Sequence, residues 1–126
     1  WQGYFVDLPG YGYAKVSKAE QAGWRRHFEA YLTRRESLRG TLLLLDARHG
    51  VKDPDRQMFD WLMQAGLAPL VLLTKSDKLP GADAAKVVKD VSRHLMVDPH
   101  FVLGCSATKG SGTEQAWRRL VELSAP

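Results

Sequence analysis

The sequence predicts an α/β fold with a mostly parallel sheet and helices on both faces. Four short apolar runs bounded by turn residues have the pattern of buried strands. Segments of helical period alternate with them, and each run is apolar along nearly its whole length, as in a parallel sheet covered on both faces. The predicted strands are residues 4–6, 41–45, 70–73 and 101–103.

A helix is predicted after each strand, from an apolar stripe and, in three cases, from a start signal. The expected start signals are the capping boxes Ser17-x-x-Glu20 and Ser111-x-x-Glu114, and Asp53 as an N-cap before Pro54 at the first helical position. The four stripes are, in order, Trp24, Phe28, Tyr31 and Leu32; Met58, Trp61, Leu62 and Ala65; Val87, Val88, Val91 and Leu95; and Ala116, Trp117, Leu120 and Val121.

Size and composition indicate one domain, or part of one, because 126 residues with 44% hydrophobic side chains can bury a single core. A lone cysteine suits a reducing compartment, so the cytoplasm is expected. No apolar run approaches the roughly 18 residues that span a bilayer. The net charge of +4 permits an anionic partner such as RNA, and a monomer is expected. The chain starts on Trp1 and is strand-like by Tyr4, so we expect it to be part of something longer.

In open α/β sheets ligands bind at the carboxyl ends of the strands, so chemistry is sought there. Directly after the run 70–73 come Thr74, Lys75, Ser76 and Asp77. An ionised Asp77 can accept both the N1–H and the N2 amino group of guanine, whereas adenine offers an acceptor at N1. The stem of Lys75 can lie over the flat face of the base. A solvated surface loop is the alternative for this motif taken alone.

Two weaker motifs follow other strands. Asp7, Leu8, Pro9 and Gly10 form a D-x-x-G, in which Asp7 would orient a Mg²⁺-bound water and the Gly10 amide would approach a terminal phosphate. The alternative there is a plain turn. Small residues after the last strand would let backbone amides approach a base oxygen, or would simply pack; they are Cys105, Ser106 and Ala107. The three motifs occur in the order that a GTP-binding domain requires.

Longer stretches around these motifs resemble one family, the EngB (YihA/YsxC) GTPases of the TrmE-Era-EngA-EngB-septin-like P-loop superfamily. The resemblance runs from about Gly3 to Val121. It is carried by D-L-P-G-Y-G-Y-A from Asp7, by Asp46-x-Arg48 with the following Lys52, Asp53 and Asp55, and by T-K-S-D-K-L from Thr74, where threonine replaces the asparagine of most GTPases.

The resemblance implies a cytoplasmic GTPase that binds GTP or GDP with Mg²⁺ and acts in assembly of the large ribosomal subunit, in contact with that subunit or its RNA. It also implies a role in normal septation and cell division. Residues 1–126 would be the carboxy-terminal two-thirds of its G domain. It assigns guanine binding to the residues from Thr74 to Asp77 and from Cys105 to Ala107. It assigns phosphate and switch roles to the residues from Asp7 to Gly10, and in it Asp7 contacts the metal ion through a water molecule. No catalytic residue is assigned.

Two departures from the GTPase pattern bear on mechanism. Tyr11 stands where Ras-like enzymes have a water-orienting glutamine, so slow intrinsic hydrolysis is expected. The phosphate loop G-x-x-x-x-G-K-[ST] is absent, since Lys109 comes before Gly110 in the nearest glycine cluster. The resemblance places that loop after a further strand at the centre of the sheet. The chain would therefore lack the amino-terminal strands of the domain, this central strand among them.

From the missing phosphate loop and strand we expect weak GTP binding and poor independent stability of the 126 residues. Whether this chain is an enzyme is left open, although the complete parent would hydrolyse GTP. The alternative function is a degenerate, non-hydrolysing remnant that binds RNA or protein. Basic residues of the first helical region fit an RNA contact or a solvated helix equally well; they are Lys15, Lys18, Arg25, Arg26, Arg34, Arg35 and Arg39.

Overall fold

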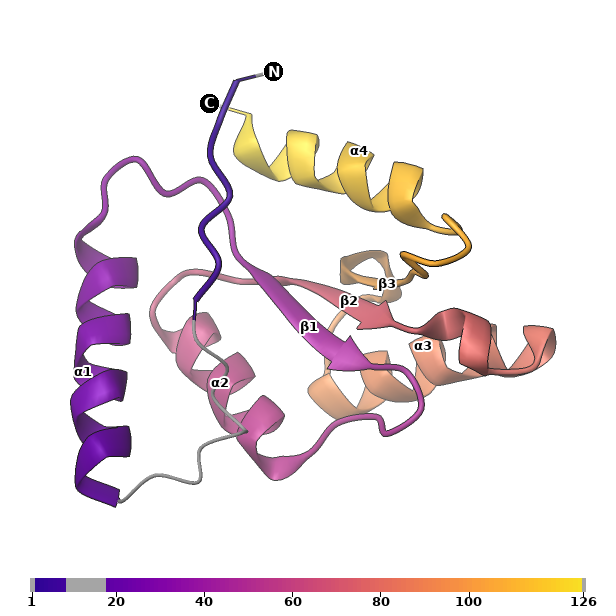
Figure 1. Cartoon of the computed structure of the whole chain (residues 1–126), viewed down its shortest axis with the longest axis horizontal. Coiled ribbons are helices and arrows are strands. Elements are labelled where there is room, and N and C mark those ends of the chain that lie inside the picture. Colours follow the sequence, from indigo (N-terminus) through magenta and orange to yellow (C-terminus); the bar gives the residue numbers. More distant parts are fainter. Residues whose placement is uncertain (1, 9–17, 126) are drawn as a thin grey trace. The chain divides into compact units, whose positions relative to one another are not determined.

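The computed structural model describes residues 2–8 and 18–125, which fall into two compact units, residues 1–38 and 39–126. The first unit contains helix α1 (Lys18–Arg34; Figure 1). Within it Arg25 pairs with Glu29 one turn later at 2.9 Å. Leu32 is buried, as its place in the predicted stripe requires. The capping box at Ser17 and the side chain of Trp24 lie outside the described part.

The predicted strand at residues 4–6 is wrong. Residues 2–8 form neither helix nor strand, and Tyr4 is 91% exposed. The physical reason is that a strand is defined by hydrogen bonds to a neighbouring strand, and the apolar character of a run does not supply that neighbour. In the family resemblance this neighbour is the strand that precedes the phosphate loop, which these 126 residues do not contain.

The second unit holds a three-stranded parallel sheet, which confirms the predicted fold class. Its strands are β1 (Leu42–Asp46), β2 (Leu70–Thr74) and β3 (Val102–Gly104), in that spatial order. The register aligns Leu42 with Leu70 and Val71 with Val102, so the carboxyl ends of all three strands lie at one edge. Three of the four predicted strands are therefore present within a residue of their expected bounds.

Three helices cover this sheet: α2 (Asp53–Gln64), α3 (Gly81–Leu95) and α4 (Thr113–Ser124). The chain steps from β1 to β2 to β3 in one direction, and right-handed crossovers then place α2 and α3 on the same face. Figure 1 shows those two helices on one side of the sheet and α4 on the other. Val71 and Leu73 of the central strand are completely buried, whereas Leu44 of β1 is 58% exposed.

The helix starts and stripes differ in detail from the prediction. Helix α2 begins at Asp53 with Lys52 as its N-cap, because the carboxylate of Asp55 accepts the Lys52 amide at 2.8 Å from inside the first turn. The buried residues of α2 are Phe59, which the predicted stripe omitted, and Leu62. Trp117 of α4, expected in the core, is 45% exposed.

Helix α4 begins at Thr113 after Gly112 instead of after Ser111. The carbonyl of Ser111 is already engaged by the Ser106 amide at 2.9 Å, which holds Ser111 in the preceding loop. Within the described parts of the chain, no helix is long and apolar enough to cross a bilayer.

Candidate functional site

The loops after β2 and β3 are joined by backbone hydrogen bonds beyond the ends of the strands. The amide of Cys105 donates to the carbonyl of Leu73 at 2.8 Å, and the amide of Ser76 donates to the carbonyl of Cys105 at 3.1 Å. These bonds continue the parallel pairing into the loops. The motif that starts at Thr74 and the motif that starts at Cys105 therefore lie side by side, as the sequence predicted.

A carboxylate and a hydroxyl meet where these loops touch. Ser106 Oγ donates to Asp77 Oδ1 at 2.8 Å, and the amide of Lys109 donates to Ser106 Oγ at 3.1 Å. Ser106 is completely buried, and the Asp77 side chain is only 10% exposed. The Ser106 hydrogen bond lowers the pKa of Asp77, against a smaller opposing effect of burial, so this carboxylate is ionised at neutral pH.

Ser106 is held by a closed loop that depends on a glycine. Its carbonyl accepts the Gly110 amide at 2.8 Å, and its amide donates to Ser111. Gly112 has a φ of 75°, and a Cβ built on it would lie 2.1 Å from the Gly104 carbonyl oxygen. No side chain fits there without a backbone shift. The chain returns tightly onto the end of β3, and this return places Ser106 against Asp77.

Lys75 has an uncommon backbone conformation for a residue with a side chain. Its φ of 59° is left-handed, and it caps the short 3-10 turn η1 (Ser76–Lys78), which contains Asp77. Non-glycine residues in this region cost about 1 to 2 kcal/mol and persist where the surroundings hold them. Lys75 is exposed, and its ammonium lies 3.4 Å from Asp46 Oδ2 at the end of β1.

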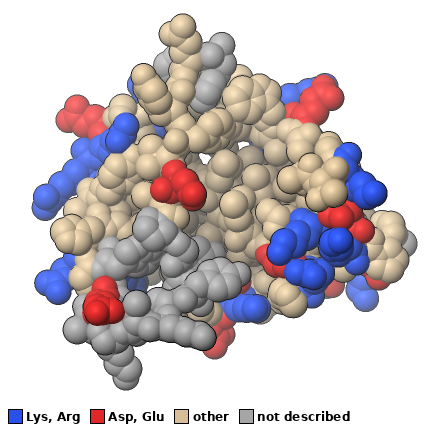
Figure 2. All heavy atoms as spheres, viewed as in Figure 1, with Lys and Arg blue, Asp and Glu red and all other residues tan. Residues whose placement is uncertain are grey.

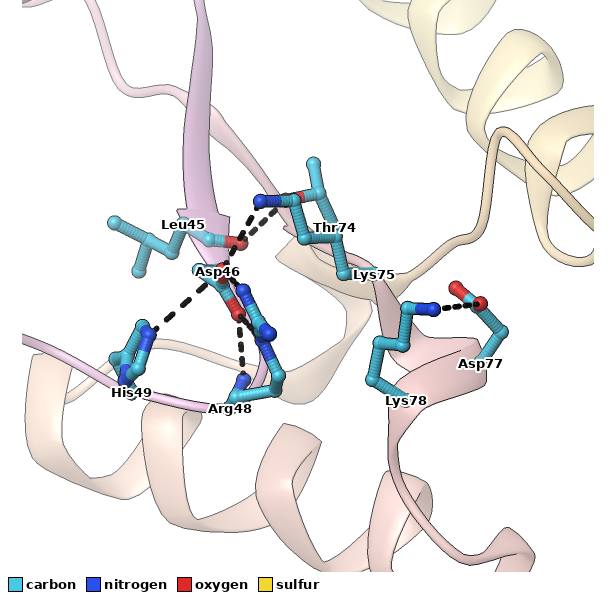
Figure 3. Close-up of polar contacts among 8 residues, drawn as sticks. All are labelled: Leu45, Asp46, Arg48, His49, Thr74, Lys75, Asp77 and Lys78. Atoms are coloured by element: carbon cyan, nitrogen blue, oxygen red, sulfur yellow. Dashed lines mark hydrogen bonds and ion pairs between the residues drawn. The ribbon is translucent and has the colours of Figure 1, made fainter.

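Asp46 gathers three basic side chains at the end of β1 (Figure 3). The Arg48 guanidinium donates from Nε to Oδ1 at 3.0 Å and from Nη2 to Oδ2 at 2.8 Å, and the Arg48 amide adds a bond to Oδ1 at 2.9 Å. Lys75 lies beyond Oδ2, and His49 Nε2 is 4.0 Å away. The Arg48 side chain is the main cause that holds the pKa of Asp46 far below its usual range.

A further bond secures β1 to β2 beside this cluster. Thr74 Oγ1 donates to the Leu45 carbonyl at 3.2 Å, and the Ala47 amide donates to the Thr74 carbonyl at 2.9 Å. The threonine that replaces the usual asparagine thus joins two strand ends. Over the carboxyl ends of β1 and β2, Figure 2 shows Lys and Arg side chains interspersed with acidic ones.

The predicted guanine-binding residues lie at the end of β2 and in the two adjoining loops that follow β2 and β3. Ser76 is partly buried and Cys105 is buried, where loss of water raises the pKa of its thiol. Ala107 is exposed at the start of the closed loop. Asp7 is exposed and Leu8 half-buried in the first unit, while Pro9 and Gly10 lie outside the described residues. Sequence reasoning gave Asp46 no role, although an acid at a strand end with arginine two residues on was a visible signal.

A parallel sheet with polar side chains at the carboxyl ends of its strands is the architecture of nucleotide-binding α/β domains. Residues 23–126 match the family described as "Elongation factor Tu GTP binding domain". The chain is 41% identical over 122 residues to "Probable GTP-binding protein EngB" of Bacillus subtilis strain 168, covering 95% of this chain and 62% of that protein.

Proteins of the same name from Syntrophomonas wolfei and Shouchella clausii are 43% identical over 122 residues and 40% identical over 121. These alignments cover 97% and 94% of this chain, which spans only 63% and 60% of those relatives. A solved structure titled "Crystal structure of a probable GTP-binding protein engB" superposes with a TM-score of 0.78, covers 94% of this chain and 74% of its own, and is 17% identical, which shows the shared fold. The chain belongs to the elongation factor Tu GTP binding domain family. Its sequence is similar to those of the EngB GTP-binding proteins over nearly its whole length.

Proposed function

We propose that this chain carries the guanine-reading part of a GTP-binding domain, with Asp77 as the residue that recognises the base. The observation that carries the proposal is the Ser106 to Asp77 hydrogen bond, which orients a nearly buried, ionised carboxylate at the carboxyl end of a parallel strand. A carboxylate oxygen has two lone-pair sites, so Oδ1 can accept from Ser106 and still accept from a ligand.

Guanine fits this carboxylate because it presents two adjacent donors. Its N1–H and N2 amino group can each donate to one oxygen of Asp77, in a charge-assisted bidentate pair. Adenine has no N2 amino group and presents an acceptor at N1, so it would leave the carboxylate unpaired. A site built to bond a missing group rejects the analogue by about 10⁴ or more. The remaining contacts proposed are the Lys75 stem on the base face and the Ala107 amide near the guanine oxygen. The Ser106 amide already donates to the Ser111 carbonyl, so Ser106 acts through its hydroxyl on Asp77.

The test is a protein-observed NMR titration of the whole chain with guanosine monophosphate and adenosine monophosphate. We expect weak binding of the guanine nucleotide and none of the adenine nucleotide. In Asp77→Asn one hydrogen-bond acceptor becomes a donor, so guanosine monophosphate should bind roughly 10 to 100 times more weakly, the loss of a hydrogen bond to a charged group. Xanthosine monophosphate, which has an acceptor where guanine has the N2 amino group, should then bind the variant better than the wild type.

The matched control is Asp60→Asn, which makes the same chemical change on the surface of α2, where Asp60 pairs with Arg56 at 3.3 Å. It should bind like the wild type. Equal binding of guanosine and adenosine monophosphates, or no change of base preference in Asp77→Asn, would reject the proposal. Because the chain lacks a phosphate loop, submicromolar affinity for GTP would contradict the expectation of weak binding.

For the complete protein, we propose a cytoplasmic GTPase that uses Mg²⁺ and times a step in assembly of the large ribosomal subunit, with septation as a further role. Among the described residues no group of three or more His, Cys, Asp and Glu side chains could hold a metal ion, and Asp7 is exposed. These residues do not make up a magnesium site, and we derive no step through the ion. In the full-length protein, association with isolated large subunits should be stronger with a non-hydrolysable GTP analogue than with GDP, and single-turnover hydrolysis should be slow.

A second candidate function is a non-hydrolysing module that binds RNA. It is favoured by the exposed arginines along and just after α1, namely Arg25, Arg26, Arg34 and Arg35. Binding through such side chains releases counterions and weakens steeply as salt rises. Absence of binding to ribosomal RNA would rule this function out, and an affinity independent of salt and of these arginines would reject them as the binding surface.

A further inference from the structure

Two carboxylates at the strand ends face different amounts of positive charge. Asp46 receives a two-pronged Arg48 contact and the Lys75 ammonium at 3.4 Å. The one ion pair of Asp77 in the described part of the chain is with the Lys78 ammonium at 4.0 Å, and its Oδ1 accepts the Ser106 hydroxyl. Lys75 precedes Asp77 by just two residues, yet its ammonium is directed to Asp46 (Figure 3). Arg48 and Lys75 therefore both contact Asp46, the carboxylate for which no contact with the base is proposed.

We propose that Asp46 holds the Arg48 guanidinium and the Lys75 ammonium away from Asp77, and so leaves the Asp77 carboxylate open to the two donors of guanine. This inference rests on the proposed function of Asp77. It makes Asp46 a positioning and specificity residue that acts through its neighbours without touching the nucleotide.

The geometry at Asp46 explains why the cations stay there. The guanidinium matches a carboxylate as a planar fork, and such bidentate charge-assisted pairs are stronger than single contacts. The backbone amide of Arg48 adds a third bond to Oδ1, which fixes the orientation of the carboxylate itself. A lysine can then approach Oδ2 from the side that the guanidinium leaves open. Asp77 has one of its four lone-pair sites taken by Ser106 and keeps the others for a ligand.

Asp77 is the carboxylate to which the released cations would turn. The pKa of Arg48 is raised first by its hydrogen bond to Asp46, then by that charge, and also by the charge of Asp77, so the two lie within electrostatic reach. The other charged groups acting on Asp77 are Lys78 and Lys109. A guanidinium or ammonium paired with Asp77 would occupy the lone pairs that guanine needs and would compete with the base.

The experiment combines a ¹³C NMR titration of the Asp77 carboxyl with the guanosine monophosphate titration, both on the whole chain. The variant is Asp46→Asn, which keeps an oxygen for the Arg48 amide and removes the charge. We expect the pKa of Asp77 to fall further below its wild-type position and the nucleotide to bind about two- to fivefold more weakly, the range of an exposed ion pair. Asp60→Asn is the control and should change neither quantity.

Adding Arg48→Gln to Asp46→Asn separates positioning from simple damage. The double variant lacks the released guanidinium, so the pKa of Asp77 should return toward its wild-type position and the affinity should recover in part. If Asp46 were only structural, the double variant would be no better than the single one. Should Asp46→Asn not fold, Asp46→Ser repeats the test, since its hydroxyl can also accept the Arg48 amide.

The outcomes distinguish this inference from the function on which it rests. An unchanged pKa of Asp77 in the folded Asp46 variant would overturn the inference, and so would a double variant that shows no recovery. Failure of the wild-type chain to prefer guanosine over adenosine monophosphate would overturn the proposed function instead. The Asp77 titration needs no ligand, so it tests the placement of Arg48 and Lys75 whether or not the proposed function holds.

Discussion

Replacing Gly112 with alanine adds only one methyl group, yet it should strongly destabilise the fold. In Gly112→Ala the new methyl group would lie 2.1 Å from the Gly104 carbonyl oxygen and 3.1 Å from Cys105 Cα. Both neighbours are backbone, so the loop must move. The left-handed φ of 75° adds about 1 to 2 kcal/mol for a residue with a side chain, and overpacking adds about 1 to 3 kcal/mol. We expect a total loss of about 2 to 5 kcal/mol in the free energy of unfolding.

Urea denaturation followed by circular dichroism measures this loss, and Gly110→Ala is the matched control. Gly110 has the same φ of 75°, but apart from Gly110 itself and its two chain neighbours no described residue has an atom within 4 Å of the position that the alanine methyl group would take. The control should therefore lose only the conformational part, about 1 to 2 kcal/mol. The difference between the two variants isolates the close approach to β3. Equal losses would show that the tight return at Gly112 does not hold the loop.

Two further predictions concern a helix end and acid pH. Met96, which is 80% exposed and left-handed with a φ of 55°, ends α3, so Met96→Gly should raise the free energy of unfolding by about 0.5 to 1 kcal/mol in the same urea assay; a loss would contradict this. The pKa values of Asp46 and Asp77 are lowered in the folded chain, so ionisation of these two carboxyl groups stabilises the fold. This contribution to the free energy of unfolding is complete above about pH 4 and is lost as the pH falls further. Melting temperatures should drop below that pH, less so in Asp46→Asn.

The fold could be predicted where the signal is local. Residues 41–45, 70–73 and 101–103 are apolar runs between turn residues, and each forms a strand because its neighbours come from the same unit. Residues 4–6 carry the same signal but pair with no strand of the described residues, so an identical pattern gave a wrong prediction. The starts of α2 and α4 were each displaced by one residue, since Asp55 and Ser111 make bonds that their spacing alone does not reveal.

The candidate site also has one part that could be predicted from the sequence and one part that could not. The pairing of Asp77 with Ser106 follows from the rule that parallel strands place their carboxyl ends at one edge, and the structure brings the two side chains together. The ion pair of Asp46 with Lys75 could not be predicted, because it depends on the left-handed backbone that turns Lys75 toward β1. Such a conformation is uncommon for lysine and has no sequence signature.

The division of the chain into two units separates two parts of nucleotide recognition. All the residues proposed to read the base lie in residues 39–126, where strand pairing, the closed loop and the Asp46 cluster hold them. Asp7, proposed to respond to the terminal phosphate, lies in residues 1–38. On the proposed function, base selectivity should therefore follow substitutions in the second unit, whereas tight binding requires a phosphate loop, which is absent from this sequence. We therefore expect a chain that discriminates well between bases but binds nucleotides weakly.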